Sequence, residues 1–202
     1  MTKIKICGLS RKTDIEYVNE LKPDYIGFVF AESRRKVTVD QAEDLRIGLD
    51  KGIKTVGVFV DEPLESLIYI SERLRLDVIQ LHGNEDFRYI KQLSAYEIWK
   101  SIGISGPEDL KRMEDQPVET ILVDSKVPGS LGGTGQSFDW SLLNGTSHRK
   151  KIILAGGLNP QNVSEAIKQV KPFAVDVSSG VESGGIKDFY KIEEFIRKVR
   201  NT

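Results

Sequence analysis

The sequence predicts a single-domain (β/α)8 barrel over residues 1–202. Eight apolar segments with the pattern of buried strands alternate with helical segments at even spacing along the chain. Such short strand-to-helix connections favour parallel strands joined by right-handed crossovers. An open doubly wound sheet would satisfy the same pattern. Eight even repeats that begin with a strand and end with a helix fit a closed barrel better.

The expected strands are short runs of branched apolar residues bounded by glycine, proline or polar residues. In chain order they cover Lys3–Gly8, Tyr25–Phe30, Ile53–Val60, Val78–Leu81, Glu97–Ile102, Thr120–Val123, Lys151–Ala155 and Phe173–Val177. Because roughly 250 residues are typical of this fold, a chain of 202 residues should have short loops.

The expected helices follow from apolar residues at helical spacing and from capping residues. Thr38 with Gln41 and Ser105 with Glu108 have the form of capping boxes, and Asn159 is expected as an N-cap. The predicted helices cover Ser10–Leu21, Thr38–Leu49, Asp61–Leu74, Phe87–Leu93, Ser105–Gln116, a segment around Trp140, a segment after Asn159, and Ile186–Val199.

Composition excludes several classes of protein. With 39% apolar and 29% charged residues, the chain is expected to be a soluble globular domain with a sizeable core. Its 29 basic and 30 acidic residues form no long run of one sign, so neither nucleic acid nor an anionic membrane is an expected partner. A lone cysteine and the lack of an apolar N-terminal segment indicate a cytoplasmic protein. Its oligomeric state, monomer or homodimer, stays open.

Candidate catalytic residues are sought where strands end and helices begin, because active sites of such barrels lie at that face. Cys7 ends the first expected strand and Asp124 follows the sixth. A free cysteine is more often a small buried hydrophobic residue, and a strand-end aspartate is often a cap. Their joint placement at the mouth of one barrel favours a catalytic pair.

Small residues after strands seven and eight predict a phosphate site. Free backbone N–H groups at such helix or turn starts attract anions, and barrel enzymes often bind phosphate there. A glycine at a turn needs no ligand, so the prediction depends on finding two such segments on adjacent strands. The expected phosphate-binding residues are Gly156, Gly157, Ser178, Ser179 and Gly180, with Gly133, Thr134 and Gly135 as a lid over the ligand or simply a flexible loop.

Several segments together resemble the signature blocks of the phosphoribosylanthranilate isomerase family, in the family's order and across the whole chain. They are Lys3–Leu9, Phe28–Arg35, Gln80–Gly83, Leu122–Asp124, Gly133–Gly135, Ala155–Val163 and Asp176–Glu182. One departure lies at Ser33-Arg34-Arg35, where the family usually has a proline between the serine and the arginine. Arg35 still aligns with the family's arginine.

The resemblance implies a (β/α)8 barrel of tryptophan biosynthesis that acts without metal or cofactor on a small phosphorylated substrate. The implied reaction is the Amadori rearrangement of N-(5'-phosphoribosyl)anthranilate. Asp124 would be the general acid that opens the ribose ring, and Cys7 the general base that removes the C2 proton. Arg35 would bind the anthranilate carboxylate, for which a planar fork of donors is suited.

The residues around Cys7 and Asp124 are also expected to contribute to the site. A thiol base needs a positive neighbour or a helix N-terminus to form its thiolate. Lys5 lies on the same strand face as Cys7 and either fills this role or forms an ion pair with Asp176. The ion pair is the preferred prediction, because burying a lysine without a partner costs free energy. Gln80, His82 and Asp176 are expected to bind the substrate, and for His82 support of a neighbouring residue is the alternative. Isolated from other histidines, His82 does not indicate a metal site.

Three other functions compete. The histidine-pathway barrel isomerase runs the same rearrangement on another phosphoribosyl amine, but that family is expected to have an aspartate base at the first strand, and Cys7 argues against it. A phosphate-binding lyase or epimerase would need a catalytic lysine or metal ligands at the strand ends. A non-catalytic phosphate-binding barrel would not need both Cys7 and Asp124.

Overall fold

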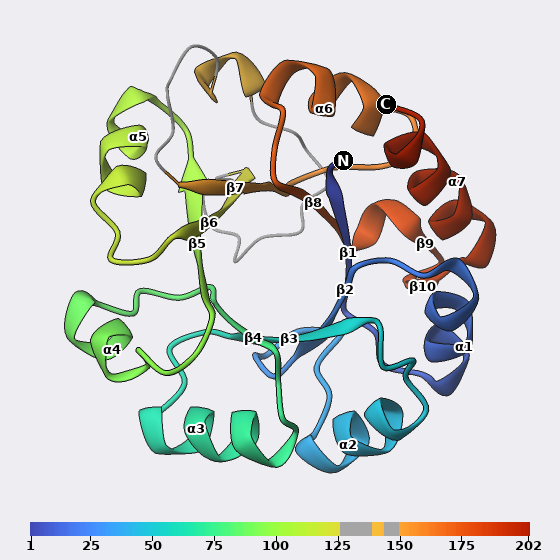
Figure 1. Cartoon of the computed structure of the whole chain (residues 1–202), viewed down its shortest axis with the longest axis horizontal. Coiled ribbons are helices and arrows are strands. Elements are labelled where there is room, and N and C mark those ends of the chain that lie inside the picture. Colours follow the sequence, from blue (N-terminus) through green and yellow to red (C-terminus); the bar gives the residue numbers. More distant parts are fainter. Residues whose placement is uncertain (126–138, 144–149) are drawn as a thin grey trace.

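The computed structural model describes residues 1–125, 139–143 and 150–202. Eight parallel strands close into a barrel in chain order, with β8 pairing with β1 (Figure 1). The strands are β1 (Lys3–Cys7), β2 (Tyr25–Val29), β3 (Lys54–Phe59), β4 (Val78–Leu81), β5 (Ile98–Ile104), β6 (Thr120–Ser125), β7 (Lys151–Leu154) and β8 (Ala174–Val177). Every predicted strand is present, with ends that differ by at most two residues.

Helices form a ring around the barrel (Figure 1). They are α1 (Lys12–Leu21), α2 (Val39–Ile47), α3 (Leu64–Arg73), α4 (Phe87–Gln92), α5 (Pro107–Glu114), α6 (Val163–Val170) and α7 (Phe189–Arg200), with short 3-10 turns η1 (Trp140–Leu143) and η2 (Ser179–Val181). None of the described helices is long and apolar enough to cross a membrane.

The two faces of each strand serve different layers. On β1, Ile4 and Ile6 are buried in the cluster between sheet and helices, as the alternation of side chains predicts. A second cluster fills the barrel interior, where the rings of Tyr25 and Trp99 pack edge to face with centroids 4.9 Å apart. Lys5 is fully buried on the face opposite Ile4 and Ile6. Cys7 shares this face and lines the pocket described below.

Of the three predicted helix N-terminal caps, the structure confirms one and corrects two. Thr38 and Gln41 form the expected capping box. Ser105 does not use Glu108, because its N–H and Oγ both donate to Asp109 Oδ2 instead, at 2.8 and 2.9 Å. Asn159 caps a turn that precedes α6, since its Oδ1 accepts from the N–H groups of Gln161 and Asn162 and the helix itself begins at Val163.

The predicted last helix begins too early. Ile186–Lys187 forms a short strand, β10, which pairs antiparallel with β9 (Glu182–Ser183), and α7 starts at Phe189. Gly184 and Gly185 both have positive φ and make the connecting turn, for which glycine is suited. This hairpin follows β8 and the η2 turn, and it contributes two charged side chains beside the site described next.

Candidate active site

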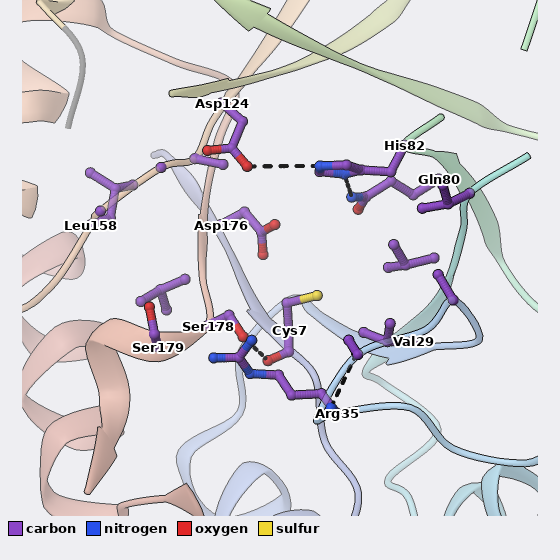
Figure 2. Close-up of a pocket in the computed structure, with 18 of the residues that line it drawn as sticks. Cys7, Val29, Arg35, Gln80, His82, Asp124, Leu158, Asp176, Ser178 and Ser179 are labelled. Atoms are coloured by element: carbon purple, nitrogen blue, oxygen red, sulfur yellow. Dashed lines mark hydrogen bonds and ion pairs between the residues drawn. The ribbon is translucent and has the colours of Figure 1, made fainter. Parts of the chain in front are cut away.

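A pocket of about 390 Å³ opens among the C-terminal ends of the strands (Figure 2). Its lining includes most of the residues expected at the site. Among them are Cys7, Arg35, Gln80, His82, Asp124, Gly156, Gly157, Asp176, Ser178 and Ser179. The sequence thus correctly located the pocket, and Cys7 and Asp124 line it from β1 and β6.

Cys7 ends β1 with its thiol in the pocket wall (Figure 2). Gly27 on β2 is its register partner, and a Cβ there would lie 2.8 Å from Cys7 Sγ, so the glycine leaves room for the sulfur. Burial raises the pKa of the Cys7 thiol, while Lys5 acts in the opposite direction. Lys5 therefore favours the thiolate, as expected of a positive neighbour, but desolvation outweighs it and the pKa stays above its ordinary value.

Lys5 and Asp176 form the predicted ion pair beneath the pocket. Lys5 Nζ donates to Asp176 Oδ2 at 3.0 Å, and the two residues are register partners on β1 and β8. Burial opposes the charge on Lys5, but Asp176 and Cys7 together raise its pKa above its ordinary value. Lys5 is therefore a cation at neutral pH, paired with Asp176 and acting on Cys7 as well.

His82 links Gln80 to Asp124 across the pocket (Figure 2). Its Nδ1 lies 3.1 Å from Gln80 Nε2, and its Nε2 lies 3.8 Å from Asp124 Oδ2. Burial, and then the positive charge of Lys5, lower the pKa of His82 to about 4, so the ring is neutral at physiological pH. An amide nitrogen can only donate, so Nδ1 of the neutral ring accepts from Gln80 Nε2 and the ring proton lies on Nε2, which faces Asp124.

The loops after β7 and β8 bring most of the residues predicted to bind phosphate into the pocket lining. Gly156 and Gly157 have φ of 81° and 69°, values that favour glycine, and both line the pocket with Ser178 and Ser179. Gly180 is not among the lining residues. A Cβ there would overlap the carbonyl oxygen of Leu158, so this glycine allows the two loops to pack together.

The predicted lid residues Gly133, Thr134 and Gly135 lie outside the described residues. Their contact with a ligand stays a prediction. Among the residues that the structure describes, no group of three or more histidine, cysteine, aspartate or glutamate side chains could hold a metal ion.

Arg35 lines the pocket, but its guanidinium is bound to a carboxylate of the protein. Its Nε and Nη2 donate to Glu182 Oε1 and Oε2 at 2.7 and 3.0 Å. Arg34 and Lys187 bind the same carboxylate, each at 2.7 Å. These four residues, Arg34, Arg35, Glu182 and Lys187, are called the Glu182 cluster below.

The Glu182 cluster connects to Cys7. Lys187 Nζ donates to the carbonyl oxygen of Ser178 at 3.0 Å, and Ser178 Oγ donates to the carbonyl oxygen of Cys7 at 3.0 Å. Burial opposes ionisation of Glu182, but Arg35 and Lys187 lower its pKa below the ordinary value. Sequence reasoning assigned no role to Glu182 or Lys187. The Gly184-Gly185 turn was the signal that could have placed Lys187 back beside Glu182.

Comparison with known proteins decides the family. A family model described as N-(5'phosphoribosyl)anthranilate (PRA) isomerase matches residues 4–198. The chain belongs to the phosphoribosylanthranilate isomerase family. The N-(5'-phosphoribosyl)anthranilate isomerase of Thermoanaerobacter pseudethanolicus is 54% identical over 200 residues, covering 99% of this chain and 98% of that protein.

Solved structures of the family agree over the full chain. Phosphoribosyl anthranilate isomerase from Thermotoga maritima matches with a TM-score of 0.91 at 36% identity, covering 100% of both chains. A second structure from that organism, with a TM-score of 0.89 and the same identity and coverage, is described as coming from a dimeric enzyme. An isomerase in complex with reduced 1-(O-carboxyphenylamino)-1-deoxyribulose 5-phosphate matches with a TM-score of 0.89 at 35% identity, again over both chains. The predicted family, barrel fold and assignment as an isomerase of tryptophan biosynthesis are confirmed.

Proposed function

We propose that this isomerase converts N-(5'-phosphoribosyl)anthranilate by general acid–base catalysis, with Asp124 as the acid and Cys7 as the base. One observation carries the proposal. The only thiol of the chain and the carboxyl group of Asp124 line the same pocket from β1 and β6, with the small-residue loops after β7 and β8 beside them (Figure 2).

The first step opens the sugar ring. Asp124 gives a proton to the ring oxygen, the bond from that oxygen to C1 breaks, and the nitrogen lone pair forms the protonated Schiff base. His82 Nε2 lies 3.8 Å from Asp124 Oδ2 and, being neutral, adds no positive charge that would favour the ionised carboxylate. We assign His82 the role of positioning Asp124.

The second step moves a proton. The Cys7 thiolate removes the proton from C2, and the electron pair shifts to make the enolamine. In the collapse to the ketone, the C2 hydroxyl loses its proton, the carbon–carbon double bond electrons take up a proton at C1, and the C2 carbonyl forms. Since burial raises the pKa of Cys7, the thiolate is a minor species at neutral pH, and Lys5 is the cation that stabilises it.

Two anionic groups of the substrate have separate partners. Backbone N–H groups of Gly156, Gly157, Ser178 and Ser179 are assigned to the phosphate. Arg35 is assigned to the anthranilate carboxylate through its Nη1, since Glu182 is bound to Nε and Nη2.

Activity and binding measured together test these assignments. Anthranilate-type fluorescence, followed after mixing phosphoribosylanthranilate with excess enzyme, should be lost much faster than by spontaneous decay. Cys7→Ala or Asp124→Ala should lower turnover by roughly 100- to 10,000-fold. Both variants should still bind the reduced product, because its phosphate and carboxylate contacts lie elsewhere in the pocket. A variant with near-normal turnover would remove its residue from the mechanism.

The cellular setting follows from the same chemistry. A catalytic cysteine must remain a free thiol, which suits a reducing compartment such as the cytoplasm. We propose a cytoplasmic enzyme that is a monomer or a homodimer, the second supported by a relative described as dimeric.

A further inference from the structure

A buried ion pair lies behind the pocket wall, and neither of its residues lines the pocket. Lys100 Nζ donates to Glu85 Oε2 at 2.9 Å, and the two residues are only 5% and 8% exposed. Lys100 follows Trp99 on β5. Because Trp99 belongs to the cluster inside the barrel, the Lys100 side chain leaves the opposite face of the strand. Removing both charges from water costs free energy, which further hydrogen bonds to the pair must offset.

The pair binds the backbone of Gly83 at both of its polar groups. The Gly83 N–H donates to the two carboxylate oxygens of Glu85 at 3.1 Å each, and the Gly83 carbonyl oxygen accepts from Lys100 Nζ at 2.6 Å. A side chain does not fit at this position, since a Cβ on Gly83 would lie 2.4 Å from Asp61 Oδ1. The residue that follows His82 is therefore fixed at its N–H and at its carbonyl group.

The Glu85 carboxylate also connects three consecutive strands. Its Oε1 accepts from the N–H of Asp61 at 3.0 Å. Asp61 lies two residues after β3 with a φ of 49°, an uncommon conformation for a residue with a side chain, and its Oδ1 accepts from the N–H of Asn84 at 2.6 Å. The loops after β3 and β4 are thus joined to each other and, through Lys100, to β5.

This connection lies next to His82 in the chain. The His82 N–H donates to the carbonyl oxygen of Phe59 at 2.8 Å, so the backbone is held before the ring as well as after it. From this fixed backbone the ring faces Asp124, with Nε2 3.8 Å from Oδ2 (Figure 2). A displacement of the loop after β4 would move the ring away from Asp124 and let water reach it.

We propose that Lys100 and Glu85 are positioning residues, which hold the loop after β4 so that the His82 ring stays against Asp124. Since neither residue lines the pocket, the pair acts through His82 and not on the substrate. The inference rests on the proposed function, in which Asp124 is the acid. It extends the residues on which the reaction depends to a pair behind the pocket wall.

Amide hydrogen exchange of the wild-type protein tests the attachment of the loops. The N–H groups of Gly83 and Asp61 belong to loops, yet both donate to a buried carboxylate. They should therefore exchange as slowly as the amides of β4. Exchange as fast as in an unstructured peptide would overturn the proposal.

Glu85→Gln separates a positioning role from a purely electrostatic one. The charged groups that face His82 are Lys5, Glu85, Lys100, Asp124 and Asp176. The charge of Glu85 raises the pKa of His82, so its loss alone would lower that pKa. Release of the loop would admit water, and the pKa should then rise from about 4 toward its ordinary value of 6.5.

Nitrogen-15 NMR of the imidazole ring measures this pKa, and the signals of His82 are those that vanish in His82→Asn. We expect a rise in Glu85→Gln. A pKa that stays at about 4 or falls in this variant would overturn the proposal.

The rate of the chemical step should change together with the pKa. In single turnovers with excess enzyme, Glu85→Gln should be slowed roughly 10- to 100-fold, because a shift of about 1 Å in a catalytic group can cost about 100-fold. Its affinity for the reduced product should stay within about twofold of the wild type. A wild-type rate would overturn the proposal. Turnover that survives in Asp124→Ala would instead count against the proposed function, and the His82 titration, which needs no turnover, still tests the pair.

Asp14→Asn is the matched control. Asp14 is 1% exposed, accepts from the N–H groups of Ser10 and Arg11 at 3.0 Å each, and binds the Arg11 side chain. It thus holds the loop after β1 as Glu85 holds the loop after β4. The control should leave the His82 pKa at about 4. A rise equal to that in Glu85→Gln would indicate general loosening and overturn the proposal.

A double variant replaces Glu85→Gln if circular dichroism shows that the single variant does not fold. Glu85→Gln combined with Lys100→Met removes both charges and leaves no unpaired buried lysine. The two charges shift the His82 pKa in opposite directions, so a rise in this variant would again come from release of the loop. An unchanged pKa in the folded double variant would overturn the proposal.

Discussion

At the scale of single residues, the site joins a thiol of raised pKa to a lysine of raised pKa. Burial accounts for the first, and pairing with Asp176 and Cys7 for the second. Lys5 therefore works against a larger desolvation effect and does not reverse it. The resting enzyme keeps a protonated thiol, which would limit unwanted thiolate chemistry before the substrate enters.

Alkylation of Cys7 measures this balance. The rate of reaction with iodoacetamide should rise with pH with a midpoint above 9.0, the ordinary thiol value. In Lys5→Met the midpoint should move further upward, because the cation that favours the thiolate is gone and Asp176 still disfavours it. Mass spectrometry can follow the modification, since the chain has one cysteine. A midpoint below 9.0 in the wild type would contradict the burial argument.

His82 makes stability depend on pH. Its folded pKa of about 4 lies below the ordinary value of 6.5, so the unfolded chain binds this proton first as the pH falls. The contribution of a neutral His82 is fully present above pH 6.5 and is lost as the pH falls toward 4. The loss should be about 3 kcal/mol.

Urea unfolding of the wild type and of His82→Asn at several pH values checks this sign. The variant lacks the titrating ring, so the free energy of unfolding should fall less steeply below pH 6.5 than in the wild type. Parallel pH profiles for the two proteins would show that His82 is not held neutral.

At the scale of elements, the hairpin β9–β10 braces the pocket from outside the barrel. Glu182 and Lys187 pair across it, and they connect the loop after β2, through Arg34 and Arg35, to the loop after β8. Both loops flank β1, which carries Cys7. The Glu182 cluster combines three cations with one carboxylate, a net positive charge beside the groups assigned to an anionic substrate.

Glu182→Gln tests the bracing role. The amide keeps the shape of the side chain but loses the charge and the two-point acceptor for Arg35. We expect KM to rise by about tenfold or more while kcat changes less, because Arg35 is assigned to binding and not to proton transfer. Arg34→Gln is the control, since Arg34 is more than half exposed and binds Glu182 from the outside. A fall in kcat at constant KM would contradict this division.

At the scale of the whole molecule, the barrel was predictable because its signals are local. Strand alternation, the Thr38 and Gln41 cap and the polar strand ends can each be read within a few residues. Closure of the barrel then places these ends around one pocket, so the position of Cys7 and Asp124 in its lining could be predicted from their places at strand ends.

What the sequence could not show depends on contacts between distant segments. Arg35 and Glu182 are 147 positions apart, and nothing near Arg35 indicates that its guanidinium is already paired. Burial of Lys187 is equally non-local, because a lysine in a short polar stretch has the pattern of a surface residue. The net direction of the Cys7 pKa shift could not be predicted for the same reason. A nearby lysine is visible in sequence, while the extent of desolvation is a property of the folded barrel.

The central claim is that Cys7 takes the C2 proton of the substrate in this pocket. Phosphoribosylanthranilate carrying deuterium at C2 tests it most directly, in single turnovers of the wild type and Cys7→Ala. The wild type should consume the deuterated substrate more slowly than the ordinary one, and Cys7→Ala should consume both roughly 100- to 10,000-fold more slowly than the wild type does. Rapid turnover by Cys7→Ala, with the same isotope effect as the wild type, would contradict the claim.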